Sequence, residues 1–79
     1  MPEVSVSIPR AGQAVVEGNI EEWLVPDGTV VTEGDPIYVL ETDKVSMEVV
    51  APVSGTLSIL LGVGGPYAVG TEIARIHAS

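Results

Sequence analysis

Glycine and proline interrupt this 79-residue chain so often that a long helix has little room to form. The nine glycines and six prolines leave one longest uninterrupted interval, the fifteen residues from 37 to 51. Apolar side chains in that interval recur with a period near two, which is the period of a strand. The other apolar residues are mainly Val, Ile and Leu, and branched aliphatic side chains suit a pleated surface. The chain is therefore predicted to be all-β.

Strands are expected wherever alternating apolar residues lie between these breakers. The stronger candidates cover residues 4–8, 18–25, 37–41, 45–50, 56–61 and 72–76, and weaker extended segments cover 29–31 and 67–69. Between Glu41 and Val45 only three residues remain to reverse the chain, which is a usual length for a hairpin connection. The sequence therefore predicts a hairpin with Thr42, Asp43 and Lys44 at its tip.

A short pattern of glycines and apolar residues occurs twice along the chain. The second copy follows the first at offsets of 37 and then 36 residues, so that segments 18–20, 27–28 and 34–37 correspond to 55–57, 64–65 and 70–73. Two copies are too few for a solenoid, whose stacked repeats normally number three or more. Two halves that close on each other leave few free sheet edges. We expect a flattened β-barrel or sandwich of two sheets with quasi-twofold symmetry, in which the hairpin tip and the chain ends lie at opposite poles.

The length of the chain, residues 1–79, allows one small domain. A domain of this size buries only about 60–65% of the surface that its unfolded chain exposes. The sequence contains no cysteine, so neither a disulfide nor a thiolate zinc site can stabilise the fold, and the redox state of the compartment is left open.

Lys44 is the only lysine of the chain. A lysine in a turn is ordinarily a solvated charge. The stretch from Glu41 to Val49, however, resembles the modification site of lipoyl domains, the swinging-arm carriers of 2-oxo acid dehydrogenase complexes. In those domains a lysine between Asp and a small apolar residue receives lipoate. The resemblance implies that Lys44 is the covalent attachment site for lipoate and that Asp43 and Val45 are its recognition flanks.

This resemblance extends along almost the whole chain. Residues 4–9 and 15–18 resemble the opening of a lipoyl domain, residues 23–31 and 34–35 its middle, and residues 51–57 and 69–76 its end. The chain is similar to the lipoyl domain, within the biotinyl/lipoyl-attachment family, of a dihydrolipoamide acyltransferase. Residues 62–67 depart from the pattern, because many relatives have an acidic segment there, so a partner role for this segment is in doubt.

The resemblance implies a non-catalytic carrier with several partners. A lipoyl ligase or octanoyl transferase modifies the lysine, and a thiamin-dependent 2-oxo acid decarboxylase reductively acylates the lipoyl group. The acyltransferase catalytic domain passes the acyl group to coenzyme A, and dihydrolipoamide dehydrogenase reoxidises the arm. The chain itself offers no plausible set of nucleophile, base and oxyanion donors, so it is not expected to be an enzyme.

Four further residues are candidates for partner recognition through the same resemblance. Glu41 and Gly28 match positions where lipoyl domains commonly carry Glu and Gly, although Gly28 is also explained by a turn. Arg10 and Gln13 lie in the segment 9–14, which in the family packs beside the lysine hairpin and helps the decarboxylase to recognise its carrier. A plain connecting loop is the alternative for this segment.

Two alternative functions remain open. Biotinyl carrier domains usually have Met on both sides of the modified lysine, whereas here the nearest methionine is Met47, three positions later. The second alternative is an unmodified lipoyl-like interaction domain. Intact mass distinguishes all three functions.

Charge and hydropathy exclude several other classes of partner. The net charge of −8 and the pI near 4.1 argue against binding to nucleic acid or to an anionic membrane. The carboxylates are scattered and His77 is the only histidine, so no metal site is expected. No apolar run approaches the roughly twenty residues of a membrane span, and no signal peptide or transit sequence is recognised. We expect a cytoplasmic location in a bacterium, or the mitochondrial matrix for a eukaryotic parent.

Overall fold

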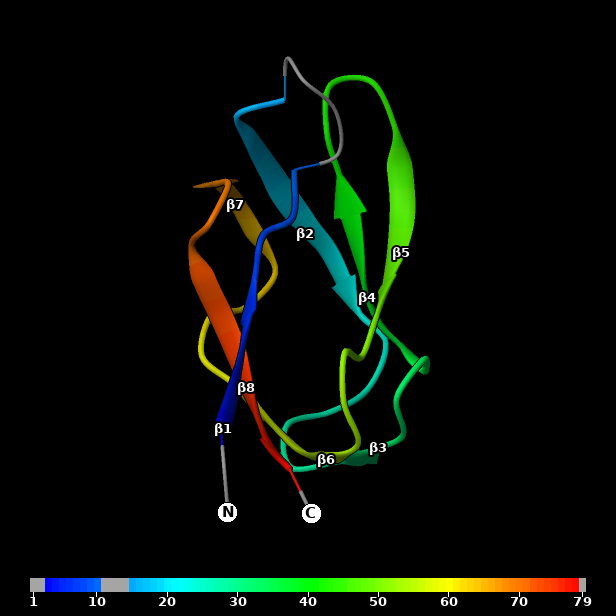
Figure 1. Ribbon diagram of the computed structural model, residues 1–79. Coiled ribbons are helices and arrows are strands. Elements are labelled where there is room, and N and C mark those ends of the chain that lie inside the picture. The colour runs from blue at the N-terminus through cyan, green and yellow to red at the C-terminus, as the bar shows by residue number, and fades with distance from the viewer. Residues whose placement is uncertain (1–2, 11–14, 79) are drawn as a thin grey trace.

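The computed structural model describes residues 3–10 and 15–78, which form eight strands and no helix (Figure 1). In chain order the strands are β1 (Glu3–Ser7), β2 (Glu17–Trp23), β3 (Val30–Val31), β4 (Pro36–Glu41), β5 (Ser46–Val50), β6 (Gly55–Ile59), β7 (Gly64–Ala68) and β8 (Glu72–Ala78). The all-β prediction is confirmed. Each predicted strand is present, with ends displaced by a few residues.

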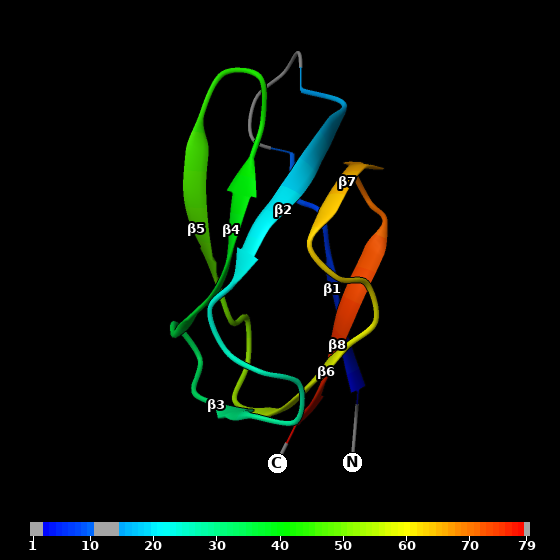
Figure 2. The same ribbon diagram turned by 180° about the vertical axis from the view of Figure 1, so that it is seen from behind.

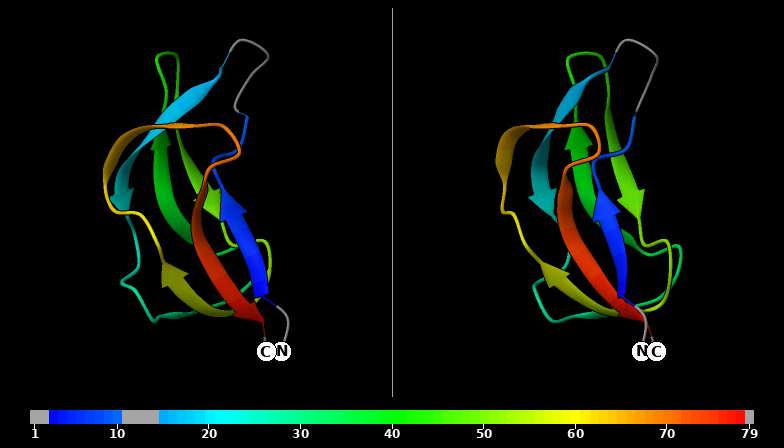
Figure 3. Two further views of the ribbon diagram at one scale, coloured as in Figure 1. Left: turned by 90° about the vertical axis from the view of Figure 1, so that its left-hand side faces the viewer. Right: turned by 60° about the vertical axis from the view of Figure 1, so that its left-hand side comes forward.

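The strands form two four-stranded antiparallel sheets, ordered β1-β8-β6-β3 and β5-β4-β2-β7. Replacing β1 by β5, β8 by β4, β6 by β2 and β3 by β7 converts the first order into the second. The sheets are therefore related by the quasi-twofold symmetry that the sequence repeat predicts. Figure 3 shows the sheet that contains β1 and β8 in front of the sheet that contains β2 and β4.

The same symmetry appears in the turns. The Gly34 amide donates to the Ala51 carbonyl at 2.9 Å, and the Gly70 amide donates to the Ile8 carbonyl at 3.0 Å. These glycines have φ angles of 93° and 92°, a left-handed conformation that residues with a Cβ rarely adopt. The offset of 36 residues in the sequence thus corresponds to an equivalent turn in each half.

The core lies between the two sheets and consists mainly of aliphatic side chains. Ile20, Ile37 and Leu40 from one sheet and Leu57 and Ile73 from the other have at most 1% of their surface exposed. Complete burial of one such side chain stabilises the fold by about 1.5–3 kcal/mol. Because the sequence contains no cysteine, this shared core takes the place of disulfides.

The hairpin of β4 and β5 and the ends of the chain lie at opposite poles of the molecule (Figures 1 and 2). The molecule measures 35 × 20 × 19 Å. At one pole Glu41 pairs with Ser46 across the hairpin, and at the other Glu3 pairs with His77 between β1 and β8. The quasi-twofold relation makes these two pairs equivalent. The predicted placement of the hairpin away from the termini is confirmed.

Candidate functional site

The β4–β5 hairpin projects beyond the body of the sandwich. Every residue from 43 to 48 is exposed, so side chains on both faces of this segment reach solvent. Below the tip, Met47 pairs with the fully buried Leu40, which anchors the base of the hairpin to the core. Strand β5 begins at Ser46 and not at Val45 as predicted, because the Val45 carbonyl closes the turn by accepting a hydrogen bond from the Thr42 amide.

The turn itself is held by Thr42. Its backbone amide donates to the Val45 carbonyl at 2.8 Å, and its hydroxyl donates to the same carbonyl at 3.2 Å. The hydroxyl oxygen also accepts the amide of Val45 at 3.1 Å and the amide of Lys44 at 3.3 Å. Asp43 and Lys44 are thereby left at the tip.

Lys44 presents its amine to solvent at this tip. None of the ion pairs found in residues 3–10 and 15–78 includes it. An exposed primary amine on an anchored hairpin is suited to the attachment of a group through an amide bond. A modifying enzyme can reach the amine, and the attached group can extend into solvent. The exposed flanks, Asp43 and Val45, are available to the same partner.

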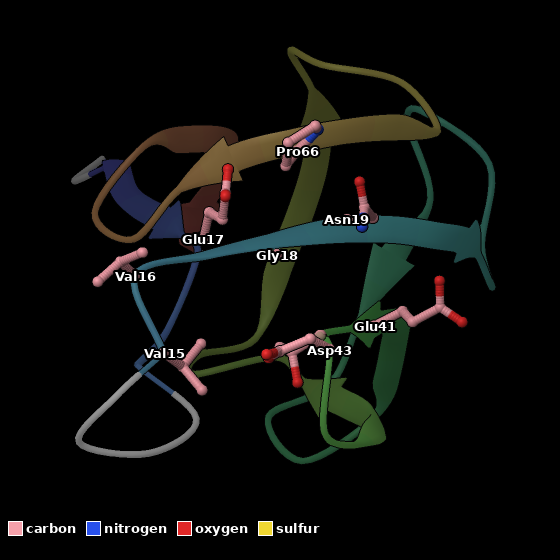
Figure 4. A pocket seen from close by; sticks show the side chains of 9 residues that line it. Val15, Val16, Glu17, Gly18, Asn19, Glu41, Asp43 and Pro66 are labelled. Carbon is pink, nitrogen blue, oxygen red and sulfur yellow. The ribbon is translucent and has the colours of Figure 1, made fainter.

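A hollow of about 430 Å³ adjoins the tip (Figure 4). It lies between the segment from Val15 to Asn19, the end of β4 with the turn, and Pro66 of β7. The carboxylates of Glu17, Glu41 and Asp43 line it. Within the described part of the chain, no ion pair neutralises these carboxylates. The surface beside Lys44 is therefore acidic and concave.

The predicted recognition residues are not all brought together. Glu41, Asp43 and Val45 surround the tip, whereas Gly28 lies in the β2–β3 connection at the opposite end of the molecule (Figure 1). Gly28 has a φ of 86°, and its amide donates to the Leu57 carbonyl at 2.8 Å, so the turn explains this glycine. Arg10 is exposed in the connection after β1, and Gln13 lies outside the described residues.

The ion pairs of the described segments lie on strands β1 and β8. Arg75 makes two hydrogen bonds of 3.0 Å to the carboxylate of Glu72, which lower the pKa of Glu72 and raise that of Arg75. His77 Nδ1 lies 3.1 Å from Glu3 Oε2, so this exposed histidine stands beside a carboxylate. In the described segments, no group of three or more His, Cys, Asp or Glu side chains is arranged to hold a metal ion, and no helix could span a membrane.

Comparison with known proteins identifies the family. A family model described as "Biotin-requiring enzyme", the biotin/lipoyl-attachment family, matches residues 4–76. The chain belongs to this family. The fold of this chain is similar to a solved structure, the lipoyl domain of the 2-oxoglutarate dehydrogenase complex from Azotobacter vinelandii. That likeness has a TM-score of 0.73 at 24% identity, covers 95% of this chain and 99% of that one, and shows the fold.

Curated relatives include acyltransferase components of 2-oxo acid dehydrogenase complexes. The succinyltransferase component of the 2-oxoglutarate dehydrogenase complex of Staphylococcus saprophyticus is 45% identical over 77 residues, which are 96% of this chain and 18% of that protein. The lipoamide acyltransferase component of the branched-chain complex of Bacillus subtilis is 40% identical over 91% of this chain and 17% of that protein. The chain thus spans less than a fifth of the length of these relatives. The predicted resemblance to lipoyl domains is confirmed.

Sequence reasoning missed two features of the site in this biotin/lipoyl-attachment domain. It placed Thr42 at the hairpin tip together with Asp43 and Lys44, and did not foresee that the Thr42 hydroxyl would accept hydrogen bonds from two amides of the tip. It also did not predict the hollow, because Asn19 and Pro66 reach the hairpin only through the pairing of β2 with β7. The signals for Thr42 in the sequence were its place in the three-residue connection and its residue type, because threonine side chains can bond nearby backbone groups in turns.

Proposed function

We propose that Lys44 carries lipoate in amide linkage and that the domain is the swinging-arm carrier of a dihydrolipoamide acyltransferase. The observation that carries this proposal is the position of the chain's only lysine, exposed at the tip of a hairpin that projects from the pole opposite the termini. When bound, lipoate supplies a dithiolane that is reductively acylated by a thiamin-dependent 2-oxo acid decarboxylase and delivers the acyl group to coenzyme A.

The residues of the domain present the arm. The Leu40–Met47 pair anchors the hairpin, and Asp43 and Val45 offer their side chains to the modifying enzyme beside Lys44. A covalent tether raises the local concentration of the arm at each active site, so weak docking of the domain is sufficient. The position of Lys44 away from the termini allows a domain tethered through its chain ends to direct the arm outward.

The partners follow from this role. A lipoyl ligase or octanoyl transferase modifies Lys44. The decarboxylase, the acyltransferase catalytic domain and dihydrolipoamide dehydrogenase then use the arm in turn, while this domain performs no catalysis. For this role we also propose a cytoplasmic location in a bacterium, or the mitochondrial matrix for a eukaryotic parent.

A biotinyl carrier is the second candidate, because the description of the matching family names biotin. The Asp43-Lys44-Val45 sequence favours lipoate over biotin.

Intact mass tests both candidates. The chain is incubated with ATP and lipoate in the presence of a lipoyl ligase, and separately with ATP and biotin in the presence of a biotin ligase. Attachment of lipoate adds roughly 190 Da and attachment of biotin roughly 230 Da. We expect one lipoyl addition on the peptide that contains Lys44, and none in the matched Lys44→Arg variant. A biotinyl addition alone would support the biotinyl carrier, and no addition from either ligase would support an unmodified interaction domain.

A further inference from the structure

The turn that presents Lys44 uses a side chain where hairpins ordinarily use the backbone. In a two-residue hairpin loop, the residues on either side of the tip usually exchange two backbone hydrogen bonds. Here the Thr42 amide donates to the Val45 carbonyl, but the Val45 amide donates to the hydroxyl oxygen of Thr42 at 3.1 Å. The same oxygen accepts the Lys44 amide at 3.3 Å.

This arrangement has a consequence for the tip. The favoured two-residue hairpin turns need a left-handed residue and therefore usually contain Gly or Asn. No non-glycine residue in the described segments has a positive φ, so Asp43 and Lys44 stay in ordinary backbone regions. A left-handed conformation is unfavourable for a residue with a Cβ, such as Lys. The Thr42 hydroxyl thus allows a lysine to occupy a tight tip without backbone strain.

Little else in the described structure fixes the tip. All side chains from 43 to 48 are exposed, and the side-chain hydrogen bonds to the Lys44 and Val45 amides both end on Thr42 Oγ1. The anchoring pair of Leu40 and Met47 lies below the turn and holds the strands. The direction in which the Lys44 side chain leaves the hairpin therefore depends on Thr42.

We propose that Thr42 is a positioning residue for the modification of Lys44, an inference that rests on the proposed function. In that step the Lys44 amine attacks the activated carboxyl carbon of lipoate. An amide bond forms, the leaving group departs with its bonding electron pair, and the nitrogen loses a proton to solvent. Thr42 contacts none of the reacting atoms and acts through the backbone amides of Lys44 and Val45.

Three substitutions separate the hydroxyl from the shape of the side chain. Thr42→Val keeps the branched shape without the hydroxyl, Thr42→Ala removes both, and Thr42→Ser keeps the hydroxyl. Thr56→Val is a matched control, because Thr56 is an exposed threonine on β6, far from the hairpin in the fold (Figure 1). Initial rates of lipoate attachment by a lipoyl ligase are followed by intact mass over a range of domain concentrations.

We expect kcat/KM for attachment to fall about tenfold in Thr42→Val and Thr42→Ala, on the scale of one or two lost hydrogen bonds. Thr42→Ser and Thr56→Val are expected to stay within about twofold of the parent chain. Two further measurements distinguish positioning from loss of fold or of access. Amide hydrogen exchange at Lys44 and Val45 should accelerate in Thr42→Val, while acylation of Lys44 by acetic anhydride should proceed at the parent rate.

The outcomes are distinguishable. A parent chain that accepts no lipoate contradicts the proposed function and this inference with it. If Thr42→Val is modified at the same rate as the parent chain, the inference is wrong and the proposed function stands. A Thr42→Ser variant as slow as Thr42→Val also overturns it, because the hydroxyl would then not be the group that matters.

Discussion

Tyr38 places a hydroxyl group in the hydrophobic core. Its side chain is completely buried on β4, and its ring packs against Trp23 with 5.1 Å between the ring centroids. Among the described residues its hydroxyl makes no hydrogen bond. Burial raises the pKa of the phenol from 10.0 to about 12. The substitution Tyr38→Phe removes this hydroxyl and leaves the ring in place.

The expected effect of Tyr38→Phe is stabilisation. A buried polar group without a partner costs about 1–3 kcal/mol, so we expect the free energy of unfolding to rise by about 1–2 kcal/mol at neutral pH. For a domain of this size each kcal/mol shifts Tm by about 4–8 °C.

The raised pKa of Tyr38 also predicts a pH dependence. The unfolded chain loses the phenol proton near pH 10, whereas the folded chain keeps it to about pH 12. Below pH 10 the phenol is neutral in both states and its titration does not affect the free energy of unfolding. As the pH rises from 10 to 12 the phenol ionises in the unfolded chain alone, which lowers the free energy of unfolding. Two pH units correspond to at most about 2.7 kcal/mol. The advantage of Tyr38→Phe over the parent chain should widen by up to that amount across this window.

Urea unfolding followed by the fluorescence of Trp23, the only tryptophan, measures both effects between pH 7 and pH 11.5. Tyr67→Phe is the matched control, because the Tyr67 hydroxyl donates to the Gly62 carbonyl at 3.1 Å. Loss of that bond should lower the free energy of unfolding by about 0.5–1.5 kcal/mol. If Tyr38→Phe instead destabilises the domain by more than 1 kcal/mol, on the scale of a lost hydrogen bond, the hydroxyl is satisfied in solution and the reasoning is wrong.

The other predictions concern the hairpin and the segment before β2. Lys44→Ala should abolish lipoate attachment and change the free energy of unfolding by less than about 0.5 kcal/mol, since an exposed turn residue contributes little; a lipoylated variant in the mass spectrum would refute the site. Exchange of Asp43 and Lys44 should sharply reduce attachment, because a one-residue shift redirects the side chain, and an unchanged rate would mean that the ligase reads only an accessible lysine. Arg10→Ala and Gln13→Ala should slow reductive acylation by the decarboxylase more than lipoate attachment, and equal acylation rates would remove both residues from recognition.

The sheet arrangement could be predicted because the sequence repeats its own plan. Glycines at equivalent positions, such as Gly34 and Gly70, mark equivalent turns, and the repeat then requires each strand of one sheet to have a counterpart in the other. The position of Lys44 opposite the chain ends follows from the same symmetry, since the hairpin turn and the termini are equivalent places.

Features that depend on tertiary contacts could not be predicted. The sequence from Gly64 to Pro66 suggests a loop, yet it forms the first part of β7, because Gly64 pairs with Ile20 of β2. The closure of the tip by the Thr42 hydroxyl depends on side-chain geometry, which the spacing of apolar residues in the sequence does not predict.

The central claim is that the domain carries acyl groups on a lipoylated Lys44. Its most direct test is the mass of the lipoylated domain after incubation with thiamin diphosphate, a decarboxylase and its substrate, with pyruvate, 2-oxoglutarate and branched-chain 2-oxo acid systems tried in parallel. We predict a gain of one acyl group in one of these systems, and none for the unlipoylated chain or for Lys44→Arg. Acylation of the unlipoylated chain, or no acylation of the lipoylated chain in any system, would contradict the claim.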